Sequence, residues 1–341
     1  MNTLWSLYHP AMPPFLRELA ATPPMARLRQ VGMNCGCEYT AFPEFSGWLP
    51  YSRFDHSLGV ALIVWHFTGD IRQSAAGLLH DVATPAFAHV VDFLHGDHLR
   101  QESTESRTAE LIDASPELQA VLRRHRLTTE DVADYRRFPI ADNDSPQLSA
   151  DRLEYTLGDL RCYGFAGADA IRAFYEDLTV WQDEAGRPEL AFRTRETACA
   201  FAKAALSVSR VYVADADRFA MQALADLLRD AVTRSVLAED DLYQTEPLVI
   251  QKLEADPASA ARWRRFRCFR RVERRANRPE DGIWYRIPAK LRYIDPLVVG
   301  QGRVSRLDDG VRQAQEAFLA TDFTRWIGVP EEADHKNDGQ L

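Results

Sequence analysis

The sequence predicts a mainly α-helical bundle that is followed by a small α+β part at the C-terminus. From Arg53 onward, apolar residues such as Leu58, Leu62 and Trp65 recur every three to four positions, which is the period of a buried helix face. The 341 residues are 46% hydrophobic and 10% aromatic, which is enough apolar surface for a large core. After about residue 239 the pattern changes, and residues 283–287 alternate as a half-buried strand does.

The chain divides into three predicted regions. Residues 1–50 form a proline-punctuated lead-in and an ordered loop that contributes to the functional site, residues 51–238 form the helical core, and residues 239–341 form the α+β region with a frayed polar tail. Beyond the helix that starts at Arg53, further helices are expected over residues 72–80, 86–94, 101–113, 116–124, 128–133, 147–160, 168–180 and 195–236, the last long and bent. Short β-like stretches are expected at residues 283–287, 291–294 and 297–299.

Composition excludes several classes of protein. The formal net charge of −9 gives no overall attraction to nucleic acid or to an anionic membrane. No run of 18 apolar residues exists, and the N-terminus lacks the basic and apolar regions of a signal peptide. The five cysteines are mostly scattered, and Cys35-Gly-Cys37 lacks the spacing of a zinc ribbon. We therefore expect a cytoplasmic protein with reduced thiols and no membrane partner.

The segment 74–92, SAAGLLHDVATPAFAHVVD, contains the most informative pair of residues, His80 and Asp81. An apolar helix leads directly into this imidazole and carboxylate, and burying an unpaired charge is costly. His56 and Asp151 lie on separate predicted helices on either side of the pair, and a bundle can bring such side chains together around a metal ion. Spacing alone leaves a second interpretation open, in which a core histidine has carboxylate neighbours on solvated faces.

Three sequence motifs resemble those of the HD-domain phosphohydrolase superfamily: Arg53-Phe-Asp-His56-Ser-Leu-Gly-Val60, Leu79-His80-Asp81 and Asp151-Arg-Leu-Glu-Tyr155. More narrowly, they resemble its deoxynucleoside-triphosphate triphosphohydrolase branch. The likeness begins at Arg27-Leu-Arg-Gln-Val-Gly32 and extends to about residue 230. The resemblance implies an HD-domain helical bundle.

The resemblance also implies roles for individual residues. His56, His80, Asp81 and Asp151 would hold one divalent metal (Mn, Fe, Co, Ni, Zn or Mg), which would polarise a phosphoryl oxygen and acidify a bound water. Arg53 would contact the phosphate through its guanidinium fork. The remaining substrate contacts implied by the resemblance are Gln30, Val31, Arg152, Tyr155, Asp159 and Tyr212. For several of these a packing or capping role is the alternative.

The chain departs from the family pattern where protons are handled. Thr84 and Gln101 stand where the family has histidines, and neither side chain titrates near neutral pH. The partner aspartate is kept as Asp92, and we expect Asp92 to perform acid/base catalysis with His89 or Glu102 in place of the missing histidines. His95 and His98 also lie close by in sequence and are alternatives for that role.

Three functions follow from these observations. The first is a metal-dependent phosphohydrolase that acts on a nucleotide or nucleotide-like phosphate ester or anhydride. The second is a catalytically weak nucleotide-binding regulatory module. The third is a dinuclear enzyme that recruits His98 or His125 for a second metal. Retention of all four ligands and Arg53 favours the first, and the resemblance further implies a homo-oligomer.

The segment 262–278 is rich in arginine, and Trp263, Phe266 and Phe269 are interleaved with the arginines. Such a pattern suits nucleic-acid binding or an allosteric phosphate site between subunits. The alternative, which we favour, is a half-buried element whose arginines pair with acidic neighbours such as those at residues 239–241.

Overall fold

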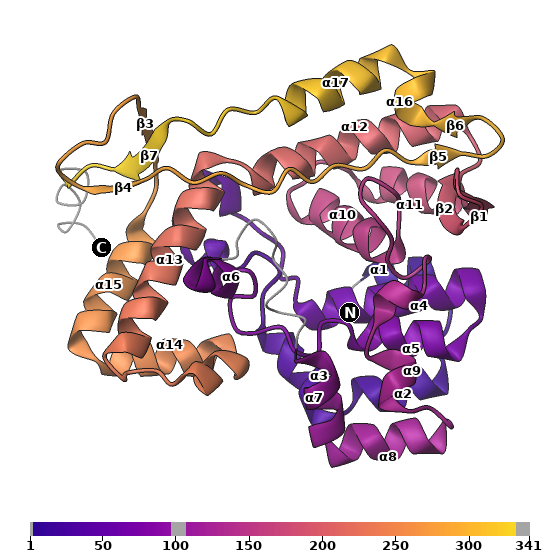
Figure 1. Ribbon diagram of the computed structural model, residues 1–341, viewed down its shortest axis with the longest axis horizontal. Coiled ribbons are helices and arrows are strands. Elements are labelled where there is room, and N and C mark those ends of the chain that lie inside the picture. Colours follow the sequence, from indigo (N-terminus) through magenta and orange to yellow (C-terminus); the bar gives the residue numbers. More distant parts are fainter. Residues whose placement is uncertain (1–2, 97–106, 332–341) are drawn as a thin grey trace.

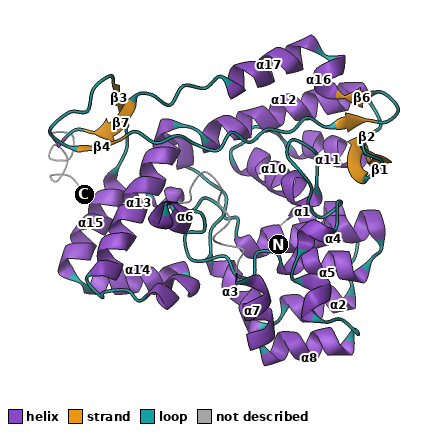
Figure 2. Cartoon of the chain, viewed as in Figure 1, coloured by secondary structure: helices purple, strands orange, loops and turns teal. Residues whose placement is uncertain are grey.

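The computed structural model describes residues 3–96 and 107–331, and most of these residues are helical. Helices fill most of Figure 2, and the strands form two small sheets near opposite ends of the molecule. The predicted fold class, mainly α with a small α+β part, is confirmed. None of the helices in the described residues combines the length and the apolar character that a membrane crossing requires.

Three helices that carry the predicted ligands pack together in the right half of Figure 1. They are α4 (Arg53–Thr68), α5 (Ile71–Leu79) and α10 (Ala150–Cys162), and both α5 and α10 pack against α4. Each begins at a side chain that accepts from a backbone N–H of the first turn: Ser52 for α4, Asp70 for α5 and Ser149 for α10. These N-caps fix where each helix starts, and so place His56, the His80–Asp81 pair and Asp151 at helix ends that face one another.

A large apolar core surrounds these helices. The other helices that contribute to it include α1 (Thr3–Tyr8), α2 (Pro14–Ala20), α3 (Pro23–Arg27), α7 (Thr108–Ala114), α8 (Pro116–Arg124), α9 (Thr129–Val132), α11 (Ala168–Glu176) and α12 (Arg195–Tyr212). The strands β1 (Leu178–Gln182), β2 (Pro188–Phe192), β5 (Leu297–Val298) and β6 (Gly302–Arg303) form one sheet at its edge, in which β2 and β5 are parallel. Helices α16 (Val304–Leu307) and α17 (Asp309–Leu319) follow and lie along α12 (Figure 1).

A second apolar core is centred on α13 (Asp215–Thr233), in the left half of Figure 1. It includes α6 (Val90–His95), α14 (Glu246–Ala255), α15 (Pro257–Cys268) and the sheet β3 (Glu273–Arg275), β7 (Trp326–Val329) and β4 (Ile283–Tyr285). This core draws residues from both sides of residue 238, and the three predicted regions stay a prediction.

Several predicted boundaries were wrong. The helix expected from residue 86 starts at Val90, because Phe87 and Ala88 adopt left-handed φ values of 60° and 44°. The helix expected over 168–180 ends at Glu176, and β1 follows it. The helix expected over 195–236 is two helices, α12 and α13, which are separated at residues 213–214.

In the C-terminal region, residues 291–294 form no strand, whereas β4 and β5 confirm the other two β-like stretches over part of their length. Of the helix expected over 101–113, only α7 lies within the described residues. The polar tail also falls largely outside them.

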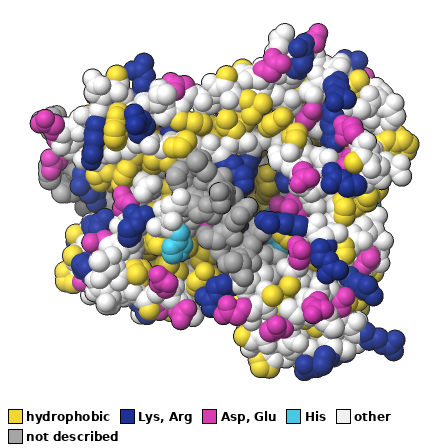
Figure 3. Space-filling view, in the orientation of Figure 1, with side chains coloured by type: hydrophobic (Ala, Val, Ile, Leu, Met, Phe, Trp, Pro, Cys, Tyr) yellow, Lys and Arg dark blue, Asp and Glu magenta, His cyan; other side chains and the backbone are white. Residues whose placement is uncertain are grey.

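The arginine-rich segment forms α15 and the strand β3 after it. Trp263 and Phe266 are buried and stack on each other with ring centroids 5.4 Å apart, so they are not available to stack on bases in this structure. Arg262 pairs with Asp230 on α13 at 3.1 Å rather than with residues 239–241. Figure 3 shows basic and acidic side chains interspersed over the visible face. A nucleic-acid partner therefore remains a prediction that the described contacts do not favour.

Candidate metal centre

Two imidazole nitrogens converge on one carboxylate oxygen at the ends of α4, α5 and α10. His56 Nε2 lies 3.0 Å from Asp151 Oδ1, and His80 Nε2 lies 3.7 Å from the same atom. Asp81 Oδ2 lies 3.7 Å from His80 Nε2 and 4.0 Å from His56 Nε2. The structure thus brings together the four residues expected to bind the metal, and its spacing identifies His56, His80 and Asp151 as a group that could hold an ion.

The opposite nitrogen of each imidazole fixes its tautomer. His56 Nδ1 lies 2.8 Å from Glu154 Oε2, and His80 Nδ1 lies 2.8 Å from the backbone oxygen of Gly77. A carboxylate and a carbonyl only accept, so each Nδ1 carries a hydrogen and Nε2 is the ring atom directed at Asp151. Without a metal, the raised pKa of His56 places a proton between its Nε2 and Asp151, and a divalent cation can take the place of that proton. This donor set therefore fits a divalent metal ion.

Glu154 is the residue of this centre that sequence reasoning missed. It is fully buried on α10, one turn after Asp151, and also accepts from the hydroxyls of Tyr51 and Tyr8. Gly59 on α4 permits this arrangement, because a Cβ at that position would overlap the Glu154 carboxylate. Glu154 lies inside the sequence word that carries Asp151, and its i+3 spacing from Asp151 was the available signal.

Electrostatics keep the centre charged. Burial alone would lower the pKa of His56, but the hydrogen bonds to Asp151 and Glu154 outweigh it and raise the pKa to about 10. Burial opposes ionisation of Asp81, but His80, Arg53 and His56 outweigh it and hold its pKa well below the usual range. The same balance lowers the pKa of Asp151 to about 2, with His56 as its main partner. Both carboxylates are therefore anionic at neutral pH, as metal ligands must be.

Arg53 is buried beside the centre rather than free in solvent. Its Nη1 donates to Asp81 Oδ2 at 3.1 Å, and its Nη2 lies 4.0 Å from Cys35 Sγ. Burial works against its charge, but Asp81 outweighs this and raises the pKa of the guanidinium, which stays charged. This position places a fixed cation next to the candidate metal ligands, as expected for a phosphate contact.

Thr84 contacts one of the candidate ligands. Its hydroxyl donates to Asp81 Oδ1 at 2.7 Å, so it holds the carboxylate in place. His89 donates from Nδ1 to Asp92 Oδ2 at 2.8 Å, and His89 lines the cavity whereas Asp92 is buried behind it. Burial lowers the pKa of His89, so the imidazole is neutral at pH 7. Glu102, Gln101 and His98 lie outside the described residues.

A cavity of about 410 Å³ opens at this centre. Its walls include the candidate ligands together with Arg53, Thr84, Arg152, Tyr155, Asp159 and Tyr212. Tyr212 donates its hydroxyl to Asp159 Oδ2, and the Tyr155 and Tyr212 rings lie 6.3 Å apart. These three predicted substrate residues thus form one wall.

Other predicted residues occupy different places. Arg152 faces the cavity, but its Nε donates to the Gln147 carbonyl at 2.7 Å and its Nη1 pairs with Asp142 at 3.2 Å, which is a packing role. Gln30 is exposed and Val31 is buried, and neither lines the cavity, so the geometry gives their expected sugar contact no support. His125 lies at the end of α8, 3.5 Å from Glu18, and does not line the cavity.

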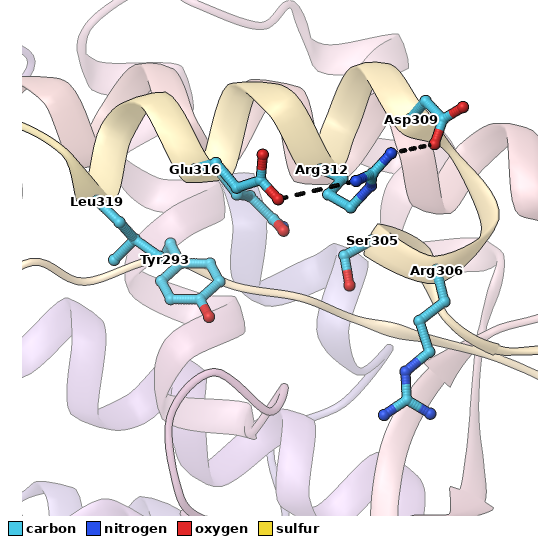
Figure 4. A pocket seen from close by; sticks show the side chains of 8 residues that line it. Tyr293, Ser305, Arg306, Asp309, Arg312, Glu316 and Leu319 are labelled. Atoms are coloured by element: carbon cyan, nitrogen blue, oxygen red, sulfur yellow. Dashed lines mark hydrogen bonds and ion pairs between the residues drawn. The ribbon is translucent and has the colours of Figure 1, made fainter.

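The chain also brings unexpected residues to the cavity. Residues 289–293, from the C-terminal region, cross its mouth and contribute Lys290 and Arg292. Tyr293 in this segment also lines a second cavity of about 590 Å³ over α16 and α17. Figure 4 shows that Arg312 in the second cavity is paired with Asp309 and Glu316. The described walls of that cavity include no histidine or cysteine, whereas the group that could hold an ion lines the first cavity.

Comparison with known proteins finds no matching family model. A protein of Bacillus subtilis named uncharacterized protein YdhJ is 27% identical over 243 residues, which are 70% of this chain and 71% of the relative. Metal-dependent phosphohydrolase cns2 of Cordyceps militaris is 24% identical over 302 residues, 85% of this chain and 81% of the relative. Uncharacterized protein YwfO of Bacillus subtilis is 30% identical over 155 residues, 40% of this chain and 33% of the relative.

Proposed function

We propose that this protein is a metal-dependent phosphohydrolase of the HD type that acts on a nucleotide or nucleotide-like phosphate ester or anhydride. The observation that carries the proposal is the convergence of His56 Nε2 and His80 Nε2 on Asp151 Oδ1, beside the Arg53–Asp81 ion pair. The distant relative named metal-dependent phosphohydrolase, which aligns with 85% of the chain, supports the same class of reaction. The resemblance to the triphosphohydrolase branch supports a nucleotide substrate.

His56, His80, Asp81 and Asp151 are the residues that would hold the divalent ion. When bound there, such an ion would supply Lewis-acid polarisation of a phosphoryl oxygen and acidify a water. Glu154 and the Gly77 carbonyl hold both imidazoles in the tautomer that presents Nε2 to the ion. Thr84 and Arg53 hold the two oxygens of Asp81 from opposite sides.

The remaining cationic side chains on the cavity wall suit a phosphorylated substrate. Arg53 has its buried guanidinium charge fixed, and Arg136, Lys290 and Arg292 add positive charge elsewhere on the wall. Preorganised cations stabilise the negative charge that builds on the transferring phosphoryl oxygens. The cavity of about 410 Å³ has the size of a small-molecule site.

We assign proton transfer to His89, with Asp92 as its hydrogen-bonded partner. Asp92 fixes the His89 imidazole through Nδ1, which leaves Nε2 as the atom that takes up or delivers a proton. Thr84 is excluded from this role because its hydroxyl is committed to Asp81 and does not titrate near neutral pH.

The proposal is tested by assaying phosphate, pyrophosphate and triphosphate release from a nucleotide panel in Mn²⁺, Co²⁺, Ni²⁺ or Mg²⁺. We expect turnover with at least one nucleotide, and we expect Asp81→Asn to lower kcat by more than about 100-fold. Asp309→Asn, which changes a carboxylate in the second cavity, is the matched control and should retain full activity. Metal-dependent binding of nucleotides without turnover would instead identify a regulatory module and contradict the proposal. Two metal equivalents per chain would favour a dinuclear enzyme.

A further inference from the structure

One end of the cavity carries polar groups that the proposed reaction does not use. Asn34 is only 8% exposed, lies on the cavity wall, and its Nδ2 has no hydrogen-bond partner among the described residues. An unsatisfied buried amide N–H costs about 1–3 kcal/mol. A buried donor on a residue that lines a cavity is satisfied when a ligand supplies an acceptor.

The orientation of the Asn34 amide is fixed by the protein. Tyr163, which follows α10, donates its hydroxyl to Asn34 Oδ1 at 3.0 Å, so the NH₂ group must point away from Tyr163. The backbone carbonyl of Asn34 accepts from Cys37 N at 2.9 Å, in a turn where Cys35 and Gly36 have φ values of 54° and 80°. The turn and the tyrosine together hold a preorganised donor.

A carboxyl group lines the same cavity from α13. Asp217 is in the first turn of that helix, and its Oδ1 accepts only a weak, 3.8 Å hydrogen bond from Cys37 Sγ. Burial raises the pKa of Asp217 to about 8, and Arg218 opposes this only in part. Met221 lies one turn further along α13 on the same cavity wall, and Met33 lines the wall next to Asn34. Thioether side chains pack favourably against aromatic rings.

Arg53 connects this end to the metal centre. One guanidinium nitrogen contacts Asp81 and the other lies 4.0 Å from Cys35 Sγ, in the residue that follows Asn34. A phosphate held at Arg53 would therefore have the candidate metal ligands on one side and the Asn34–Asp217 end on the other. The second side is where the rest of a phosphorylated substrate can extend.

We propose that Asn34 and Asp217 form a specificity subsite that reads the hydrogen-bonding edge of a nucleobase, with an acceptor of the base on Asn34 Nδ2 and an adjacent N–H group on the Asp217 carboxyl. Met33 and Met221 contact the face of the ring. This inference rests on the proposed function, because it takes the substrate to be a nucleotide whose phosphate lies at Arg53.

The test compares probes that share a phosphate chain but differ in the base. Binding is measured by isothermal titration calorimetry with the imido-linked analogues of the four deoxynucleoside triphosphates, and inorganic tripolyphosphate is the base-less probe. Hydrolysis is measured as kcat/KM on the natural nucleotides and on tripolyphosphate. We expect the wild-type protein to bind at least one nucleotide analogue more tightly than tripolyphosphate.

Asn34→Leu preserves volume and removes the donor, so it should lower affinity and kcat/KM for the preferred nucleotide roughly ten-fold and leave tripolyphosphate unchanged. Tyr163→Phe frees the amide to rotate and should give a smaller loss of the same kind, which guards against a folding defect in the first variant. Asp309→Asn changes a polar side chain of the second cavity and should change neither probe. Melting temperatures check that each variant is folded.

The outcomes separate the subsite from the reaction. Equal loss for both probes in Asn34→Leu, or no loss, overturns the subsite, as does a wild-type protein that binds nucleotides no more tightly than tripolyphosphate. Base-dependent binding that Asn34→Leu abolishes, with no hydrolysis of any nucleotide, would support the subsite and contradict the proposed phosphohydrolase.

Discussion

The protein buries acidic side chains in two neighbouring regions that differ in protonation. At the metal centre, Asp81 and Asp151 face two imidazoles and Arg53, and their pKa values are lowered. In the loop before α4 and at the start of α14, Glu38 and Glu246 lie together without an ion-paired cation among the described residues, and burial raises both pKa values. The difference teaches that burial of carboxylates does not by itself make a metal site, because only in the first pair are both carboxylates anionic at neutral pH.

The Glu38–Glu246 pair is held by structural hydrogen bonds. Glu246 accepts from the Gly32 N–H at 2.8 Å and from the Tyr39 hydroxyl at 2.9 Å, and so joins α14 to the loop that precedes α4. These bonds favour the ionised form of Glu246, and burial of Glu38 together with that nearby charge raises the pKa of Glu38 to about 8. We therefore assign the pair a role in joining the two apolar cores.

The largest effect is expected at the metal centre, where a substitution tests the difference between the two regions most directly. Asp151→Asn removes the anionic oxygen on which both imidazoles converge, so metal content should fall from one equivalent per chain to below about 0.1, with a loss of activity of more than about 100-fold. Elemental analysis after dialysis measures the content. Glu246→Gln is the matched control in the second region, and a comparable loss of metal from that variant would refute the distinction between the regions.

A smaller effect is expected for Glu154, which contacts the ligand His56 but lies behind it. The Glu154 carboxylate orients His56 and makes this ligand more basic. Glu154→Gln removes that charge, so metal affinity should weaken about 10- to 100-fold. Competition with a metal chelator measures the affinity. Unchanged affinity in a folded Glu154→Gln protein would show that the tautomer of His56 is fixed in another way.

The Glu38–Glu246 pair makes stability depend on pH. The folded-state pKa of Glu38 is above its unfolded value of 4.5, so the folded protein keeps a proton that the unfolded chain releases. The stability that Glu38 contributes is fully present below its unfolded pKa of 4.5 and is lost as pH rises through its raised folded pKa. Glu38→Gln cannot titrate, and it should flatten the decline in unfolding free energy between about pH 5 and pH 8, a change of about 1–3 kcal/mol.

Urea denaturation at several pH values measures this decline. Glu44→Gln is the control, because Glu44 is an exposed carboxylate in the same loop region. A wild-type protein whose stability rises with pH over this range would contradict the assignment of a proton to the pair.

The smallest expected effect concerns Thr84. Thr84→Val keeps the shape and removes the hydrogen bond to Asp81 Oδ1, so kcat should fall by less than about ten-fold while metal content stays at one equivalent. Thr84→Ser restores the hydroxyl and should restore the rate. A loss of kcat as large as that of Asp81→Asn would mean that Thr84 takes part in the chemistry directly.

Much of the fold could be predicted because it depends on local pattern. Local signals in the sequence mark where the main helices lie. They are the apolar period after Arg53, the N-caps before α4 and α10, and the proline at the start of α8. The hairpin of β1 and β2 was missed, because residues 168–180 continue an apolar pattern that suits either a helix or a strand over so short a length.

The candidate site was predictable to the extent that its residues lie in short sequence motifs. His56, His80, Asp81 and Asp151 meet as expected, and the words that contain them prompted the resemblance. The roles expected of Gln30 and Arg152 transferred less well, because a contact with substrate depends on side-chain direction and on competing partners such as Gln147 and Asp142. A short sequence motif does not specify side-chain direction or competing partners.

The sequence by itself therefore determined the helical class, and it predicted which residues could act as metal ligands. Tertiary structure alone decided which groups surround those ligands: Glu154 behind His56, His89 on the cavity wall, and Asn34 and Asp217 at its far end. The physical reason is that ligand types and helix caps are local properties. Tautomers, pKa values and cavity walls depend on contacts between segments far apart in the chain, which only the packed chain creates.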